Sequence, residues 1–142
     1  MISREKAREV YRAHNMRVTP QRLAVVDELI GDTTHPTVDV VARRVMQKMQ
    51  GISLSTVYKT LNELVELGLI NRVEGKGPGK EAAHFDPNTE VHGHLHCQTC
   101  GRILDLGLSG NCEVNVEGLE KEHDIHVDGV EIEMVGTCKY CL

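Results

Sequence analysis

The sequence lacks any run of about 18 apolar residues, the length that a helix needs to cross a membrane. Its N-terminal segment, MISREKAREVYR, also lacks the apolar core of a secretory signal peptide. We therefore expect a cytoplasmic protein with no membrane partner. In that compartment disulfide frameworks are rare, so the five cysteines favour metal binding or redox chemistry. The 142 residues, 40% of them hydrophobic, suffice for one ordinary core or two small ones.

Positive charge is scarce in the second half of the chain. The formal net charge is −5, but residues 1–86 hold 13 Lys and Arg against 11 Asp and Glu, while residues 87–142 hold 3 against 10. Residues 1–22 hold six basic and two acidic residues, which makes a local basic patch that could face nucleic acid. A solvated helix face is the alternative interpretation of the same patch.

The first half contains four segments with helical periodicity. Ser3, Thr19, Thr37 and Ser53 each precede such a segment as a capping residue, and Pro20 suits the first position of the second helix. The expected apolar faces of the last three helices are Leu23, Val26, Leu29 and Ile30; Val38, Val41, Val45 and Met49; and Val57, Leu61, Leu64 and Val65. Gly31 and Gly68 are expected to end the second and fourth helices.

A hairpin is expected after these helices. Its strands are residues 69–75 and 80–86, and the KGPG segment between them, residues 76–79, suits a turn. Helices followed by a hairpin are the order of a winged helix-turn-helix, in which the helix after Ser53 would enter a DNA groove. A small helical domain of another kind could show the same order. The predicted DNA-contacting residues are Arg22 of the basic segment and Ser55, Thr56, Tyr58 and Lys59 of the groove helix.

Four of the five cysteines form two Cys-x-x-Cys pairs. Cys97 with Cys100, and Cys138 with Cys141, can each aim two thiolates at one point. Together the pairs supply a tetrahedral sulfur site suited to structural Zn(II). The 37 residues between the pairs must then form a subdomain that returns the C-terminus to the first pair. A redox Cys-x-x-Cys is the competing interpretation, and Cys112 has no assigned role.

Three histidines alternate directly before the first cysteine pair, in the segment HGHLHC. On a strand, His92, His94 and His96 point to one face and Cys97 to the other, so the histidines indicate a second site. The FD and RILD motifs on either side add carboxylates. A mixed nitrogen and oxygen set suits Fe(II), Mn(II) or Zn(II) and suits calcium poorly.

These motifs together resemble the ferric uptake regulator family over nearly the whole chain. The matching segments are RVTPQR, HPT, STVYKTL, LGLI, FD, HGHLHCQTCG, RILDL and EIEMVGTCKYC. The resemblance implies an α+β fold, with a winged helix-turn-helix DNA-binding domain at residues 1–86 and a small α/β dimerisation domain with a four-cysteine zinc site at residues 87–142. It also implies a homodimeric, metal-dependent transcriptional repressor that binds a double-stranded DNA operator.

The resemblance also implies which residues sense metal. The matching regulatory ligands for Fe(II) or Mn(II) are His35, Asp86, His92, His94 and Asp105. An aspartate at position 105, where many iron-sensing members have glutamate, is similar to the peroxide-sensing PerR branch. In that branch peroxide reacts at bound Fe(II) and oxidises a ligand histidine, which makes His35 and His92 the expected targets.

Two features depart from the family pattern. His84 stands where the peroxide-sensing branch often has arginine, and it adds a donor near the predicted site. Glycines and asparagines between Gly107 and His123 make the expected dimerisation helix weak or short.

Two other functions fit parts of the sequence. One is a reversible iron-, manganese- or nickel-responsive regulator of the same family without peroxide chemistry. The other is a metalloenzyme built on the histidines and aspartates, but the sequence shows no nucleophile, general-base constellation or phosphate loop. We therefore expect a regulator that is not an enzyme.

Overall fold

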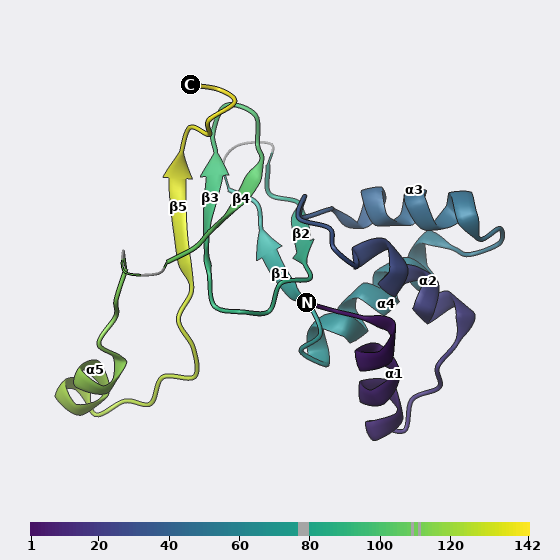
Figure 1. Ribbon diagram of the computed structural model, residues 1–142, viewed down its shortest axis with the longest axis horizontal. Coiled ribbons are helices and arrows are strands. Elements are labelled where there is room, and N and C mark those ends of the chain that lie inside the picture. The colour runs from purple at the N-terminus through teal and green to yellow at the C-terminus, as the bar shows by residue number, and fades with distance from the viewer. Residues whose placement is uncertain (77–79, 109, 111) are drawn as a thin grey trace. The chain divides into compact units, whose positions relative to one another are not determined.

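A computed structural model of the chain describes residues 1–76, 80–108, 110 and 112–142, and Figure 1 shows its helices and strands. The chain forms two compact units, Met1–Glu90 and Val91–Leu142. The first unit extends past Asp86, where the sequence placed a domain boundary. Beyond Asp86, Asn88 donates its backbone N–H to the Asp86 carboxylate and accepts a hydrogen bond from Asn71 at its carbonyl. None of the described helices is long and apolar enough to span a membrane.

Four helices begin the first unit, each after the capping residue that the sequence predicts. They are α1 (Arg4–Ala13), α2 (Pro20–Leu29), α3 (Val38–Lys48) and α4 (Leu54–Glu66). At Ser3, Thr19, Thr37 and Ser53 the side-chain oxygen accepts a hydrogen bond from the backbone N–H three residues later. This bond satisfies a donor that the first turn of a helix leaves unpaired. Gly68 follows α4 in the left-handed region, at φ 72°, as a helix-ending glycine should.

The predicted hairpin follows α4. Strands β1 (Asn71–Glu74) and β2 (Ala83–Asp86) pair antiparallel, while most of the predicted KGPG turn, at positions 77–79, lies outside the described residues. The other edge of β2 pairs with the segment that precedes α3, because Phe85 donates its N–H to the carbonyl of Pro36. Four helices and a hairpin in this order confirm the predicted winged-helix fold of the first unit.

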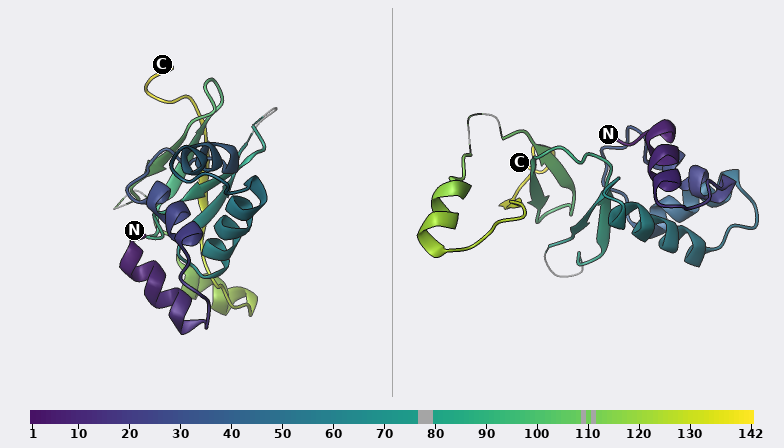
Figure 2. Two further views of the ribbon diagram at one scale, coloured as in Figure 1. Left: turned by 90° about the vertical axis from the view of Figure 1, so that its right-hand side faces the viewer. Right: turned by 90° about the horizontal axis from the view of Figure 1, so that it is seen from below.

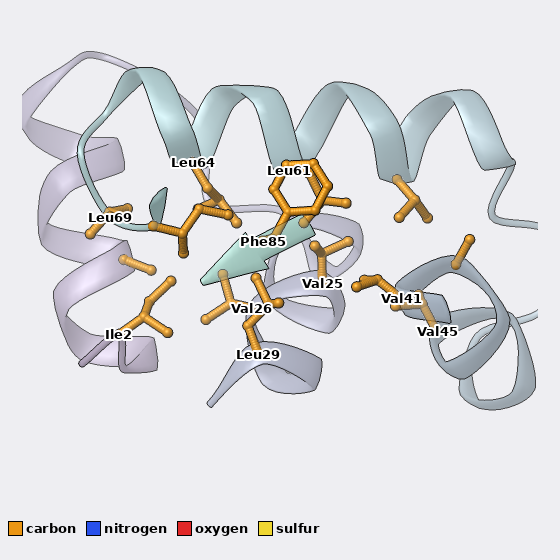
Figure 3. Packing of buried hydrophobic residues seen from close by; sticks show 14 of the residues in the cluster. Ile2, Val25, Val26, Leu29, Val41, Val45, Leu61, Leu64, Leu69 and Phe85 are labelled. Carbon is orange, nitrogen blue, oxygen red and sulfur yellow. The ribbon is translucent and has the colours of Figure 1, made fainter. Parts of the chain in front are cut away.

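The core of the first unit lies between the helices and β2. Phe85 is 1% exposed. Figure 3 shows its ring beneath α4 and next to Leu61. The predicted apolar face of α2 is wrong at one position, because Ile30 is 45% exposed while Val25 is fully buried. Helix α2 ends at Leu29, and the extended backbone of Ile30 turns its side chain away from the helix face.

The second unit is built on a three-stranded sheet. Its strands are β3 (Gly93–Cys97), β4 (Ile103–Leu106) and β5 (Ile132–Gly136), in the order β4-β3-β5. Strand β3 pairs antiparallel with β4 and parallel with β5. Helix α5 (Val116–His123) has only eight residues, contains Gly118 and has no buried residue. Figures 1 and 2 show α5 standing clear of this sheet.

We expect burial along α4 to decide the effect of a leucine truncation. Leu64→Ala removes a fully buried side chain and should lower the free energy of unfolding by about 2–5 kcal/mol. Leu54→Ala, in the same helix but 48% exposed, should change it by about 0.5 kcal/mol or less. Urea denaturation followed by circular dichroism measures both variants, and equal losses would contradict the core assignment.

Candidate metal centres

The four paired cysteines meet at the ends of β3 and β5. Cys97 ends β3 opposite Gly136 of β5, so the segment after β5 brings Cys138 and Cys141 to the first pair. The four sulfur atoms lie within 4.8 Å of one another, and Sγ of Cys100 is 3.7 Å from Sγ of Cys138. Zinc-sulfur bonds of about 2.3 Å in a tetrahedron place sulfur atoms about 3.8 Å apart. The cluster therefore fits a structural zinc ion, and Cys112 is not part of it.

Local hydrogen bonds prepare one of these sulfur atoms for a cation. Sγ of Cys97 accepts backbone N–H bonds from Cys100, at 3.5 Å, and Cys138, at 3.3 Å, which lower the pKa of Cys97 to about 5. Burial and hydrogen bonds to the neighbouring thiols raise the pKa of Cys141 to about 12. The cluster without a cation therefore cannot hold four thiolates, whereas a divalent ion would offset their charge.

A second set of donors lies on the sheet of the same unit. His94 of β3 is paired with Asp105 of β4, and His92 directly precedes β3. Nε2 of His92 is 3.0 Å from Nε2 of His94 and 3.1 Å from Oδ1 of Asp105, and the last two atoms are 3.4 Å apart. Metal-ligand bonds of about 2.1 Å give donor separations of about 3.0–3.4 Å. The three atoms therefore fit one face of a metal coordination sphere.

The first unit holds the other two predicted ligands as a buried pair. His35 and Asp86 are each 1% exposed, and Nε2 of His35 is 3.5 Å from Oδ2 of Asp86. His35 has a left-handed backbone at φ 54°, and its carbonyl accepts a hydrogen bond from Nδ1 of His84 at 2.6 Å. His84 thus supports the backbone of a candidate ligand, and it is not part of the donor clusters found among the described residues.

Sequence reasoning missed one functional candidate, Glu133 of β5. Its carboxylate accepts hydrogen bonds from Nδ1 of His94, at 3.1 Å, and from Nε2 of His96. Burial would raise the pKa of Glu133, but the bonds from His96 and His94 outweigh it and lower the pKa below its usual value. The alternation of polar and apolar residues in VEIEMVG was the available signal, but alternation does not name the partner strand.

The predicted DNA-contacting residues divide into two groups. Ser55, Tyr58 and Lys59 are exposed on the first two turns of α4, and Thr56 is partly buried with its hydroxyl 2.8 Å from that of Ser53. The guanidinium of Arg22 is instead engaged within the first unit. It bonds to the carboxylate of Glu63 at 3.1 and 3.2 Å, to the carbonyl of Arg17 and lies over the ring of Tyr11. A DNA contact by Arg22 stays a prediction.

Comparisons with known proteins agree with this architecture. A model of the ferric uptake regulator family matches residues 13–135. The peroxide-responsive repressor PerR of Staphylococcus epidermidis is 32% identical over 130 residues, which cover 92% of this chain and 84% of the relative. The Campylobacter jejuni peroxide stress regulator has a TM-score of 0.70 and 29% identity, with 99% and 100% of the two chains covered. The Helicobacter pylori ferric uptake regulator has a TM-score of 0.74 at 24% identity, covering 96% and 89%.

We expect zinc binding to separate the four clustered cysteines from Cys112. Cys138→Ser replaces a residue that is 1% exposed and should cost about one zinc ion per chain, together with the thermal stability of the second unit. Cys112→Ser should retain both. Elemental analysis after dialysis and thermal melting of both variants test this, and full zinc retention by Cys138→Ser would contradict the assignment.

Proposed function

We propose, because this chain belongs to the ferric uptake regulator family, that it is a metal-dependent DNA-binding transcriptional repressor that responds to peroxide. The observation that carries the proposal is the convergence of His92, His94 and Asp105 on one point of the second unit, apart from the sulfur cluster. A regulator needs a metal site that can change state without loss of the structural zinc. The proposal includes a cytoplasmic location and no enzymatic activity.

The regulatory site would take ligands from both units. His92, His94 and Asp105 of the second unit, with His35 and Asp86 of the first, would hold Fe(II) or Mn(II) through nitrogen and oxygen alone. The set lacks sulfur, so it suits a less thiophilic ion than the cysteine cluster does. Because the ion would take ligands from both units, its binding would favour one relative arrangement of those units. The affinity of the protein for DNA would depend on that arrangement.

Peroxide sensing is the form of regulation that the relatives favour. Bound Fe(II) would supply the electrons that reduce peroxide beside the ligand histidines, which Mn(II) would not do under the same conditions. His35 and His92 are the proposed targets of that oxidation. A ligand imidazole that gains oxygen loses basicity at its donor nitrogen, so either modification would weaken the site and release the repressor from DNA.

The DNA-contacting surface would be the start of α4. Tyr58 is 46% exposed there, and Lys59 and Ser55 are exposed on the same turns. The apolar face of the helix lies on the opposite side, in the core. Hydroxyls and an ammonium group suit phosphates, and a tyrosine can contact base edges. The second unit holds 9 Asp and Glu against 3 Lys and Arg, so it is not expected to contribute to DNA binding.

The proposed homodimer would use the second unit. Strand β5 is an edge of the sheet, and Met134 and Val135 on it are 41% and 59% exposed. Leu119 and Ile125, in and after α5, are 39% and 51% exposed. An unpaired strand edge with exposed apolar side chains favours association, and a second copy of the chain would cover it. The two copies of α4 in the dimer, one recognition helix from each chain, would then read a palindromic, AT-rich operator.

We expect peroxide to inactivate the Fe(II)-loaded protein alone. Protein loaded with Fe(II) should lose binding to operator-like DNA after brief hydrogen peroxide treatment, and peptide mass spectrometry should find one added oxygen on His35 or His92. Protein loaded with Mn(II) should keep its DNA binding. His126, whose side chain is 83% exposed, serves as an internal control and should stay unmodified. Equal survival of both forms with intact histidines would instead favour a reversible metal-responsive regulator of the same family.

We expect Lys59 to contact phosphate. Lys59→Ala should weaken binding to specific and unrelated DNA alike, and should reduce the slope of log affinity against log salt by about one for each recognition helix. Lys121→Ala removes an exposed lysine from α5 and should leave the slope unchanged. Titrations at several salt concentrations measure both slopes, and the same slope for Lys59→Ala and wild type would count against this surface.

A further inference from the structure

His94 lies between two carboxylates on one face of the sheet. It occupies the central strand β3, and the register pairs it with Asp105 of β4 on one side and Glu133 of β5 on the other. Its two ring nitrogens face these two groups separately. Nε2 is 3.4 Å from Oδ1 of Asp105, and Nδ1 is 3.1 Å from Oε1 of Glu133.

This arrangement selects one tautomer of the neutral imidazole. A carboxylate only accepts hydrogen bonds, and Nδ1 is the ring nitrogen at hydrogen-bond distance from one, because it lies 3.1 Å from Glu133 while Nε2 lies 3.4 Å from Asp105. The proton of the neutral ring is therefore assigned to Nδ1, and Nε2 can accept the N–H of His92 at 3.0 Å. Nε2 then keeps its lone pair, and it points to the place where His92 and Asp105 also direct a donor atom. The opposite tautomer would put a proton where a metal ion would bind and would leave Nδ1 with no proton to donate to Glu133.

His96 holds Glu133 from the other side. It lies two residues after His94 on the same strand and therefore on the same face, and it is 2% exposed. Its Nε2 donates to Oε2 of Glu133, so each carboxylate oxygen accepts a bond from a different histidine. Two bonds to two oxygens leave the carboxylate little freedom to rotate away from His94.

We propose that Glu133 and His96 are positioning residues, which hold the His94 ring with Nδ1 protonated and thereby set the affinity of the regulatory metal site. The inference rests on the proposed function in that it takes His94 as a metal ligand. Hydrogen bonds from ligand histidines to carboxylates are a general means of orienting such ligands, and their removal typically weakens metal binding about 10- to 100-fold. Neither residue would touch the ion.

The first test compares two variants of β5 and the residue before it. Glu133→Gln keeps the size of the side chain but removes the carboxylate, and Glu131→Gln removes the same charge from an exposed position just before the strand. In full-length protein with its zinc retained, Mn(II) affinity should fall about 10- to 100-fold in Glu133→Gln and should stay near the wild-type value in Glu131→Gln. Zinc content and the melting midpoint, measured on both, show whether the fold is intact.

The second test reads the tautomer directly, without the regulatory metal. Nitrogen-15 NMR of the imidazole rings should show His94 protonated at Nδ1 in the wild-type protein with zinc bound, and a mixture of tautomers in Glu133→Gln. His96→Gln, which keeps an N–H donor for Glu133, should lose less Mn(II) affinity than His96→Leu. This pair also carries the test if Glu133→Gln does not fold.

The outcomes separate the inference from the function that it rests on. An unchanged His94 tautomer and unchanged Mn(II) affinity in Glu133→Gln would overturn the role of Glu133. Equal affinities of His96→Gln, His96→Leu and wild type would overturn the role of His96. If His94→Ala protein bound Mn(II) as tightly as wild type, His94 would not be a metal ligand. That result would overturn the proposed effect of Glu133 and His96 on Mn(II) affinity. The NMR measurement would still decide which tautomer of His94 the two residues hold.

Discussion

Parallel pairing between β3 and β5 is the interaction that assembles the sulfur cluster and places a carboxylate beside a histidine of the second donor cluster. Its register places Cys97 opposite Gly136, which returns the second cysteine pair to the first, and it places His94 beside Glu133. A slip of one residue in β5 would turn its side chains to the other face, and it would separate the two cysteine pairs and remove Glu133 from His94 together. Zinc at the sulfur cluster would tie the ends of the two strands, so metal binding and sheet formation stabilise each other.

In the first unit, a short pairing between β2 and the segment before α3 positions the candidate ligands. The bond from Phe85 to Pro36 aligns β2 with the segment before α3, while the Phe85 side chain is held in the core beneath α4. The residues that follow and precede this bond, Asp86 and His35, therefore stay next to each other in a buried position. The same core fixes α4, so the candidate ligands and the exposed start of the recognition helix belong to one packed structure.

The two clusters differ in the type of donor atom, although both include residues of β3. Sulfur donors gather at the end of β3, where backbone N–H groups stabilise a thiolate, and nitrogen and oxygen donors gather along the strand, where carboxylates orient the imidazoles. Soft and hard ligand sets prefer different ions, so one short strand can serve a permanent site and an exchangeable one. Such separation lets a regulator change its state at one site and keep its fold through the other.

The sequence by itself determined what depends on neighbouring residues. Capping hydroxyls, the start of α2 at Pro20, the glycine that ends α4 and the two cysteine pairs are local patterns, because each involves residues within one or two helical turns or one tight turn. The motifs also sufficed to identify the family. Ile30 is exposed although its spacing predicted a buried position, because the helix ends one residue before it and its side chain therefore points in another direction.

Tertiary structure decided the contacts between residues far apart in the chain. The pairing of Arg22 with Glu63, the bond from His84 to the backbone of His35, and the clamp of Glu133 between two histidines join strands and helices whose partners the sequence does not specify. Alternation predicts which face a residue occupies, but the register between distant strands decides what it meets there. That register follows from packing the whole unit, which is why the candidate ligands were readable from the sequence and the residues that orient them were not.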